Sequence, residues 1–246
     1  MPLPYKYDLE FIPDKGIAHK ASDFGLIMTE YPVIPASKKI YNVYQIPGRA
    51  GELIQDTGTK ENIEINVTLV ELVKQENQMQ YRDFIRKVTD WLNSGSGWLQ
   101  LSDEQNTRYK VLTVQVGTSN RSTPIWGEID AVFTCEPYEY MQNGLLAHDV
   151  TTVTFNGYDL CKPLYEIEGN ATGTLTVNGK QFEINTIERL TIDSALMLAW
   201  KTVDGEVVNQ VVAGDYEDLW LPSGENTITL TPGLTAKITP RWGYEL

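Results

Sequence analysis

The side chains that could carry acid–base, nucleophilic or metal chemistry are few in this chain of 246 residues. His19 and His148 are its two histidines and lie far apart in sequence, so a histidine-based catalytic triad or zinc site lacks its groups. Cys135 and Cys161 cannot build a disulfide framework, and each lies in an apolar or strand-like stretch where a small buried thiol is common. The sequence also lacks a phosphate-binding loop, a dinucleotide-binding glycine loop and a Gly-x-Ser-x-Gly elbow. We therefore expect no catalytic site, no metal site and no cofactor, and hence no enzyme.

Carboxylates are the one reactive group that the chain has in quantity. Asp215, Glu217 and Asp218 could supply the acid–base pair of a glycoside hydrolase or the ligands of a calcium loop. However, residues 214–218 lack the alternating ligands and the closing glutamate of a calcium loop, and an acidic protein contains such clusters by chance. The favoured interpretation is a solvated loop.

Tryptophan rings could instead form a platform on which sugars stack. Trp200, Trp220 and Trp242 are the candidates in the second half of the chain. Trp200 ends the apolar run of residues 195–199, so we expect it in the core. Trp220 and Trp242 remain candidates for saccharide-facing aromatics.

The charge of the chain disfavours nucleic acids and membranes as partners. Its formal net charge is −13, divided as −5 over residues 1–140 and −8 over residues 141–246. The densest basic cluster, Arg82, Arg86 and Lys87, is interleaved with aspartates and is typical of a solvated helix face. The amino terminus lacks the features of a signal peptide, and no apolar stretch approaches the ~18 residues of a membrane span. We expect synthesis in the cytoplasm, with no specific nucleic-acid binding and no membrane insertion.

Hydrophobic periodicity predicts a first domain in which strands surround one helix. Residues 60–70 and 125–135 alternate apolar and polar side chains, as expected of half-exposed antiparallel strands. Residues 78–92 have apolar positions at helical spacing, with Asn77 and Gln80 as capping residues and residues 93–97 as the stop signal. Residues 98–101 and 109–116 predict two more strands, joined by the polar turn 102–107.

Residues 137–144 break this pattern with a proline and an Asn-Gly pair, so we expect two domains, residues 1–140 and 141–246. Helical periodicity does not return afterwards. Asn178-Gly179 between two short apolar runs predicts a tight hairpin. Strands are predicted at residues 150–156, 164–168, 173–177, 180–187, 190–193, 196–200, 226–231 and 236–239. About eight short strands favour a sandwich or jelly roll, and the chain as a whole is predicted to be mainly β.

Three segments resemble the distal tail protein family of non-contractile phage tails, chiefly of phages and prophages of Gram-positive hosts. They are residues 46–53 (IPGRAGEL) with the alternating strand from Lys60, residues 135–140 (CEPYEY), and a carboxy-terminal run that includes residues 190–194 (LTIDS), 212–216 (VAGDY) and 221–228 (LPSGENTI). The order and spacing of these pieces extend over nearly the whole chain. Pro222 and Gly224 are further apart than in the family, a departure that concerns turn geometry.

The resemblance implies a structural virion protein made of two consecutive β-sandwich domains, the first with the packed helix and the second galectin-like. It implies a ring, as a homo-hexamer, in which the first domains surround a channel and the second domains project outward. This ring would form a hub at the distal end of the phage tail, between the tail tube protein and a tail-tip or tail-associated lysin-type protein, with receptor-binding proteins as further partners. An acidic chain suits a channel through which DNA must slide.

Two features of the sequence leave alternatives open. The polar loop of residues 47–58, with Pro47, Gly48, Arg49, Gly51 and Glu52, either reaches a neighbouring subunit or is an ordinary mobile surface loop. The second domain could bind host surface saccharides and so aid adsorption, although residues 141–246 leave no room for the inserted carbohydrate-binding domain of some relatives. A tail-associated wall hydrolase is a third interpretation, and nothing in the sequence pairs catalytic groups for it.

Overall fold

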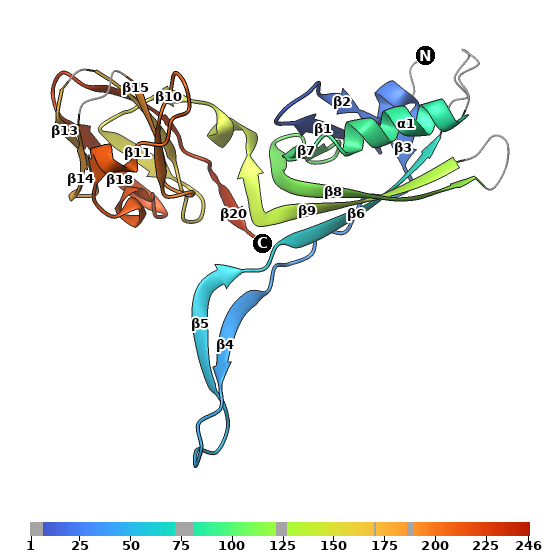
Figure 1. The fold of residues 1–246 in the computed structure, drawn as a ribbon, viewed down its shortest axis with the longest axis horizontal. Coiled ribbons are helices and arrows are strands. Elements are labelled where there is room, and N and C mark those ends of the chain that lie inside the picture. Colours follow the sequence, from blue (N-terminus) through green and yellow to red (C-terminus); the bar gives the residue numbers. More distant parts are fainter. Residues whose placement is uncertain (1–6, 72–80, 122–126, 170, 186–188) are drawn as a thin grey trace. The chain divides into compact units, whose positions relative to one another are not determined.

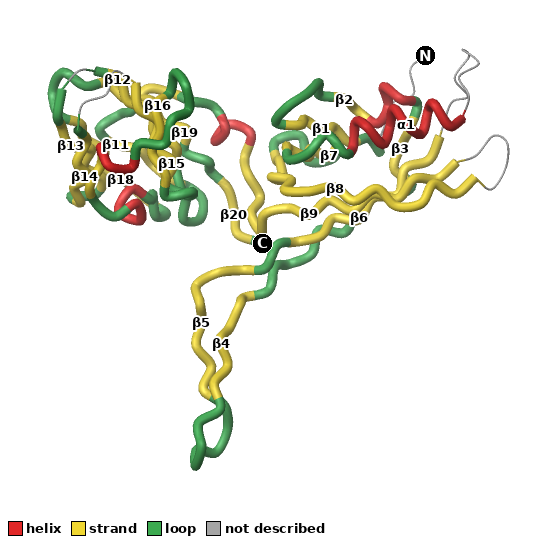
Figure 2. The backbone as a smooth tube through the Cα atoms, in the orientation of Figure 1, coloured by secondary structure: helices red, strands yellow, loops and turns green. Residues whose placement is uncertain are grey.

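The computed structural model describes residues 7–71, 81–121, 127–169, 171–185 and 189–246. The chain folds into two compact units, which we call unit 1 (residues 1–139 with Leu246) and unit 2 (residues 140–245). Strands and the turns between them make up most of both units, and α1 is the longest helix of the described residues (Figure 2). The chain is therefore mainly β, as the sequence predicts.

Unit 1 is built on one antiparallel sheet that curls over its own core (Figure 1). The strands lie in the order β2-β1-β7-β8-β9-β6-β3. Their bounds are β1 Leu9–Pro13, β2 His19–Lys20, β3 Leu26–Met28, β6 Ile63–Glu71, β7 Gly97–Leu101, β8 Thr107–Arg121 and β9 Gly127–Met141, and the 3-10 helix η1 spans Ala21–Phe24. These strands form one continuous sheet, and not the two separate sheets that the predicted sandwich implies for the first domain.

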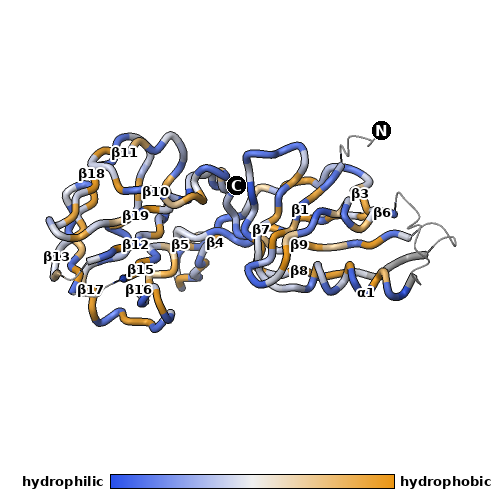
Figure 3. The backbone as a smooth tube through the Cα atoms, turned by 90° about the horizontal axis from the view of Figure 1, so that it is seen from above, coloured by the Kyte–Doolittle hydropathy of each residue, from blue (hydrophilic) through white to orange (hydrophobic). Residues whose placement is uncertain are grey.

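The core of unit 1 follows from the alternation of apolar and polar residues. Ile63, Ile65, Val67 and Leu69 of β6 are buried, whereas the intervening Glu64 and Asn66 are exposed. β9 pairs with β6 in register, from Ile63 opposite Cys135 to Val70 opposite Glu128, and alternates in the same way. Figure 3 displays this alternation of hydropathy along the strands. Both predicted strands are confirmed within the described residues, and β9 runs on through Pro137 to Met141.

The helix α1 (Tyr81–Leu92) covers the core of unit 1. Phe84, Val88, Trp91 and Leu92 point into that core at helical spacing, and Arg82 and Arg86 lie on the exposed face, where Arg86 pairs with Asp83 at 2.9 Å. The predicted helix is thus confirmed over residues 81–92. Its expected first turn, including the caps Asn77 and Gln80, lies outside the described residues.

Unit 2 consists of two five-stranded antiparallel sheets, ordered β10-β19-β12-β15-β16 and β11-β18-β13-β14-β17. Residues of both sheets, among them Tyr165, Ile192, Phe182 and Ile228, belong to one hydrophobic cluster, so the sheets enclose a shared core. The strand bounds are β10 His148–Asp149, β11 Val153–Asn156, β12 Leu164–Glu168, β13 Gly173–Val177, β14 Lys180–Ile184, β15 Arg189–Asp193, β16 Leu198–Lys201, β17 Val212–Ala213, β18 Gly224–Leu230 and β19 Thr235–Thr239. Strand β20, Gly243–Glu245, belongs to neither of these two sheets. The 3-10 helices are η2 Gln142–Leu145, η3 Asn209–Val211 and η4 Tyr216–Leu219.

Candidate functional site

A hairpin that belongs to no larger sheet is the most unusual surface feature of unit 1. Strands β4 (Lys39–Tyr44) and β5 (Leu53–Lys60) pair only with each other and stand away from the main sheet (Figure 1). We call residues 39–60 the arm. Every residue of β4 is exposed, although a two-stranded hairpin on its own is marginally stable in water. The arm therefore gains little stability from the rest of the chain.

Both faces of the arm carry exposed apolar side chains. Val43 lies opposite Ile54, and Tyr44 lies opposite Leu53, so the two pairs point to opposite faces of the hairpin. The exposed fractions are 53% for Val43, 63% for Ile54, 47% for Tyr44 and 38% for Leu53. Tyr41, Ile40 and Ile46 add to the exposed apolar surface. A large apolar surface of this kind is typical of a protein–protein contact.

The tip of the arm contains the five residues that the sequence singles out for contact between subunits. Pro47, Gly48, Arg49, Gly51 and Glu52 all lie in the exposed connection between β4 and β5. The amide N–H of Arg49 donates to the Ile46 carbonyl, and the positive φ of Gly48 (83°) and Gly51 (87°) explains glycine at these positions. The Glu52 carboxylate accepts a hydrogen bond of 3.4 Å from Gln45 Nε2.

The sequence predicts a polar loop over residues 47–58, and this extent is wrong. Residues 53–58 belong to strand β5. The sequence carries no sign of a strand here, because alternation marks a strand with one buried face, and both faces of the arm are exposed.

The candidate saccharide-facing tryptophans of unit 2 have little free ring surface. Trp242 is 9% exposed and packs against the core of unit 2, with Tyr158 stacked 6.3 Å away between ring centroids. Trp220 is half-buried, its Nε1 donates to the Ser194 carbonyl at 3.1 Å, and Lys162 Nζ lies 4.4 Å from its ring centroid. Nothing in this geometry favours a sugar platform at these rings.

Trp200, which the apolar run before it predicts to be in the core, is only half-buried, on β16. Its neighbour Ala199 is fully buried and belongs to the core cluster. Because side chains alternate along a strand, the register that buries Ala199 turns Trp200 to the other face.

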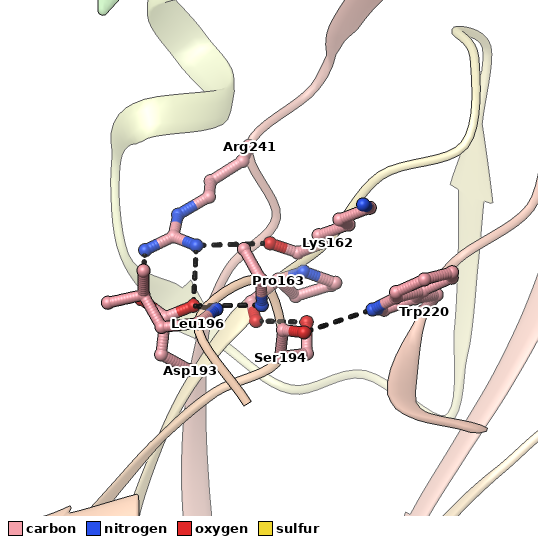
Figure 4. Close-up of polar contacts among 8 residues, drawn as sticks. Lys162, Pro163, Asp193, Ser194, Leu196, Trp220 and Arg241 are labelled. Atoms are coloured by element: carbon pink, nitrogen blue, oxygen red, sulfur yellow. Dashed lines mark hydrogen bonds and ion pairs between the residues drawn. The ribbon is translucent and has the colours of Figure 1, made fainter. Parts of the chain in front are cut away.

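Asp193 anchors a network of buried polar contacts beside Trp220, which we call the Asp193 bracket (Figure 4). Its side chain is 3% exposed and faces the Arg241 guanidinium, with Nη1 donating to Oδ1 at 2.9 Å and Nη2 to Oδ2 at 2.6 Å. Oδ1 also accepts the amide N–H groups of Ala195 and Leu196. The adjacent Ser194 hydroxyl donates to the Pro163 carbonyl at 2.7 Å. The bracket joins the end of β15, the start of β12 and the segment after β19.

Burial and ion pairing act in opposite directions on the Asp193 carboxyl. Burial raises its pKa, but the hydrogen bonds and positive charge of Arg241, together with the two amide N–H groups, outweigh burial and hold the pKa below its usual value. The carboxylate is therefore ionised at neutral pH. Its role is structural, because it holds the Arg241 side chain and the backbone of residues 195 and 196 in place.

Close backbone packing lies next to the bracket, at Gly144. Arg241 N–H donates to the Gly144 carbonyl at 2.7 Å, and Met141 N–H donates to the Trp242 carbonyl at 2.7 Å. A Cβ atom on Gly144 would lie 2.3 Å from the backbone nitrogen of Trp242, so only glycine fits.

We expect the substitution Gly144→Ala to lower the free energy of unfolding by about 3 kcal/mol, because the atom it clashes with is backbone and cannot rotate away. Gly157→Ala is the matched control, since its Cβ would meet only a Phe155 ring atom at 3.7 Å. Urea unfolding followed by circular dichroism measures both. Equal stability of the two variants would contradict the packing at Gly144.

The remaining reactive side chains occupy structural positions. His19 lies edge-on to Phe24 in unit 1, and His148 lies exposed in unit 2. Cys135 and Cys161 are buried thiols, and burial raises the pKa of Cys135 to about 12. Asp218 pairs with Lys180.

Among the described residues, no group of three or more histidine, cysteine or carboxylate side chains is arranged to hold a metal ion. No helix in the described part of the chain combines the length and apolarity needed to cross a membrane.

Comparison of the fold with solved structures identifies similar folds that extend over nearly the whole chain. The Dit protein of phage SPP1, described as a paradigm of the hub adsorption apparatus in Gram-positive infecting phages, matches with a TM-score of 0.59 at 13% identity, over 94% of this chain and 97% of that one. A chain of the phage P2 baseplate in its activated conformation with Ca matches with a TM-score of 0.52 at 10% identity, and covers the same shares. The Sr form of that baseplate matches with a TM-score of 0.52 at 9% identity. No family model and no curated protein matches the sequence. The chain thus has the fold of phage tail hub proteins, and the resemblance is confirmed at that level.

Proposed function

We propose that this chain is a distal tail protein, a non-enzymatic structural component of a phage virion that forms a ring-shaped hub at the distal end of the tail. The observation that carries the proposal is the fold match to the SPP1 Dit protein over 94% of this chain and 97% of that one, with both units included. The hub would join the tail tube protein to a tail-tip or lysin-type protein, with receptor-binding proteins as further partners.

In this proposal unit 1 forms the ring, as a homo-hexamer, and the galectin-like unit 2 projects outward. The arm supports self-assembly, because its two apolar faces have no counterpart in a soluble monomer. A ring requires a contact between two different surfaces of neighbouring copies. The arm supplies one of these surfaces.

The strands β6 and β9 suit the wall of a channel for DNA. Their shared exposed face carries Glu64, Glu128 and Asp130, and neither strand contains a lysine or arginine. An acidic wall repels the phosphate backbone and lets DNA pass without binding. Finding lysine and arginine side chains along the channel would contradict this part of the proposal.

The charged tip of the arm offers a direct test of contact between subunits. We expect the double substitution Arg49→Ala with Glu52→Ala to raise the concentration needed for assembly by about tenfold, as for the loss of a moderately important interface contact. The control is Asp83→Ala with Arg86→Ala, which removes the same two charges from an exposed ion pair on α1. Light scattering reports the oligomer in each case. Identical assembly of the two double variants would show that the tip makes no contact.

A further inference from the structure

Strand β11 is an open edge of one sheet of unit 2. It pairs with β18 in the register Val153 opposite Thr227 to Asn156 opposite Gly224. On its other side no strand of the described residues pairs with it. Natural proteins protect such edges with lysine, proline, bulges or covering segments, because an edge strand is a template for pairing with another chain. β11 contains neither lysine nor proline.

The backbone groups of β11 are divided between its two sides. The Thr152 carbonyl accepts the Ile228 N–H at 2.9 Å, so Thr152, and by alternation Thr154 and Asn156, face β18. The N–H and carbonyl groups of Val153 and Phe155 therefore face the open edge. The Thr151 hydroxyl donates to the Val153 carbonyl at 2.9 Å from this side, in agreement with that direction.

The same two residues carry the exposed apolar side chains of the strand. Phe155 is 72% exposed and Val153 is 52% exposed, whereas Thr154 is 8% exposed and Asn156 is fully buried. Backbone groups that face the open edge and exposed apolar side chains thus coincide at positions 153 and 155. Extended segments bind sheet edges through this combination, with main-chain hydrogen bonds for affinity and alternate side chains for specificity.

We propose that β11 pairs antiparallel with β11 of a second copy of this chain, about a two-fold axis at Thr154. This register sets Val153 opposite Phe155 of the second copy and Phe155 opposite Val153 of the second copy. All four residues then exchange N–H and carbonyl hydrogen bonds as two hydrogen-bonded pairs, in which each Val153 carbonyl uses its second lone pair beside the Thr151 hydroxyl. The two sheets become one continuous sheet, with the four apolar side chains side by side on its outer face.

Charge also permits this register, although unit 2 is acidic. Across β11 and β18, Phe155 lies beside Glu225, and Val153 lies beside Thr227. In the paired sheet, each row of side chains across the strands contains Glu225 and Phe155 of one copy, followed by Val153 and Thr227 of the second copy. The two glutamates therefore lie in different rows at opposite ends, and no like charges face each other across the new contact.

The pairing has a consequence that rests on the proposed function. A two-fold contact uses the same surface on both partners, whereas neighbours within a six-fold ring contact through different surfaces. The β11 contact therefore joins two rings and doubles the number of copies. One pair of four-residue strands buries little area and is weak, but six pairs between two rings act together and are strong.

Disulfide trapping tests the register in the full chain. A hydrogen-bonded antiparallel pair has a Cα separation of about 5.5 Å, within the range that a disulfide spans, whereas diagonal neighbours lie about 7–8 Å apart and outside it. Cross-linking on oxidation should therefore be at least about fivefold greater when Val153→Cys chains are mixed with Phe155→Cys chains than for either variant alone. The native Cys135 and Cys161 are buried and do not compete. Equal cross-linking of the mixed and single samples overturns the register.

Mass measurement by light scattering tests the pairing itself. The proposal predicts that Phe155→Lys halves the mass of the assembly, and that Leu146→Lys, which changes another exposed apolar residue of unit 2, leaves it unchanged. A halved mass supports the pairing whether the smaller species is a ring or a single chain, so failure of the ring does not obscure the result. If Phe155→Lys leaves the mass of the pure protein unchanged, β11 does not pair with a second copy of this chain. The edge would then be a binding site for a strand of a different protein.

Discussion

Replacing Arg241 with alanine will lower the free energy of unfolding by about 3–5 kcal/mol, because it leaves the Asp193 carboxylate buried without its counter-charge. Asp193 is 3% exposed, and both of its oxygens accept hydrogen bonds from the Arg241 guanidinium. The matched control is Arg189→Ala, which breaks an ion pair with Glu168 in which both side chains are more than half exposed. The control should cost at most about 1 kcal/mol. Urea unfolding followed by circular dichroism measures both variants.

A double-mutant cycle separates the ion pair from other effects of truncation. The double variant Asp193→Ala with Arg241→Ala should lose less stability than the sum of the two single variants, because removing both charges leaves neither one buried alone. Additive losses would mean that Arg241 contributes through packing and not through its charge.

The stability of unit 2 should depend on pH through the same carboxyl. Its pKa is lowered in the folded protein, so the bracket contributes fully above the usual aspartate pKa of about 3.9. That contribution is lost as the pH falls from there through the lower folded pKa. The stability difference between the native chain and Asp193→Asn should therefore be constant near neutral pH and shrink below about pH 4. A difference that grows in acid would contradict the direction of the pKa shift.

Replacing the two apolar residues at the centre of the arm will weaken assembly strongly without unfolding the chain. Val43→Thr with Ile54→Thr keeps β-branched side chains in a cross-strand pair, so the hairpin can still form. Each residue is more than half exposed, so neither contributes to the core of unit 1. Loss of two central interface contacts should raise the concentration needed for assembly by about 100-fold.

The control for the arm is Ile17→Thr with Val33→Thr, which alters two apolar residues of unit 1 at 74% and 82% exposure outside the arm. Both double variants should unfold at the urea concentration of the native chain. Light scattering should detect the native oligomer for the control and monomers for the arm variant. An arm variant that assembles like the control would show that the arm is not an interface.

Residues with one buried face could be predicted well from the sequence. The strands at 63–71 and 127–135 and several of unit 2, among them β11, β12 and β14, alternate, and packing against a core enforces that alternation. The Asn178-Gly179 turn also follows from local chemistry, because both residues adopt positive φ there, 50° and 80°. Local propensity and burial agree at these positions, so periodicity and turn residues in the sequence are enough to predict them.

Periodicity does not predict the arm, the Asp193 bracket or the open edge of β11. The arm has no buried face, so periodicity does not predict β4 and assigns β5 to a loop. Asp193 and Arg241 are 48 residues apart, and only the fold brings them together. The exposed edge of β11 depends on which strands pair, a property of topology and not of local sequence. The glycine-rich connection of residues 46–52 is the one local signal for the arm.

The native mass of the purified full chain in solution tests the central claim most directly. A hub ring predicts an assembly whose mass is six times the 27.8 kDa of one chain, or twelve times if two rings pair through β11. A stable mass of 27.8 kDa at every concentration would contradict a self-assembling hub and would leave a monomeric binding module in its place.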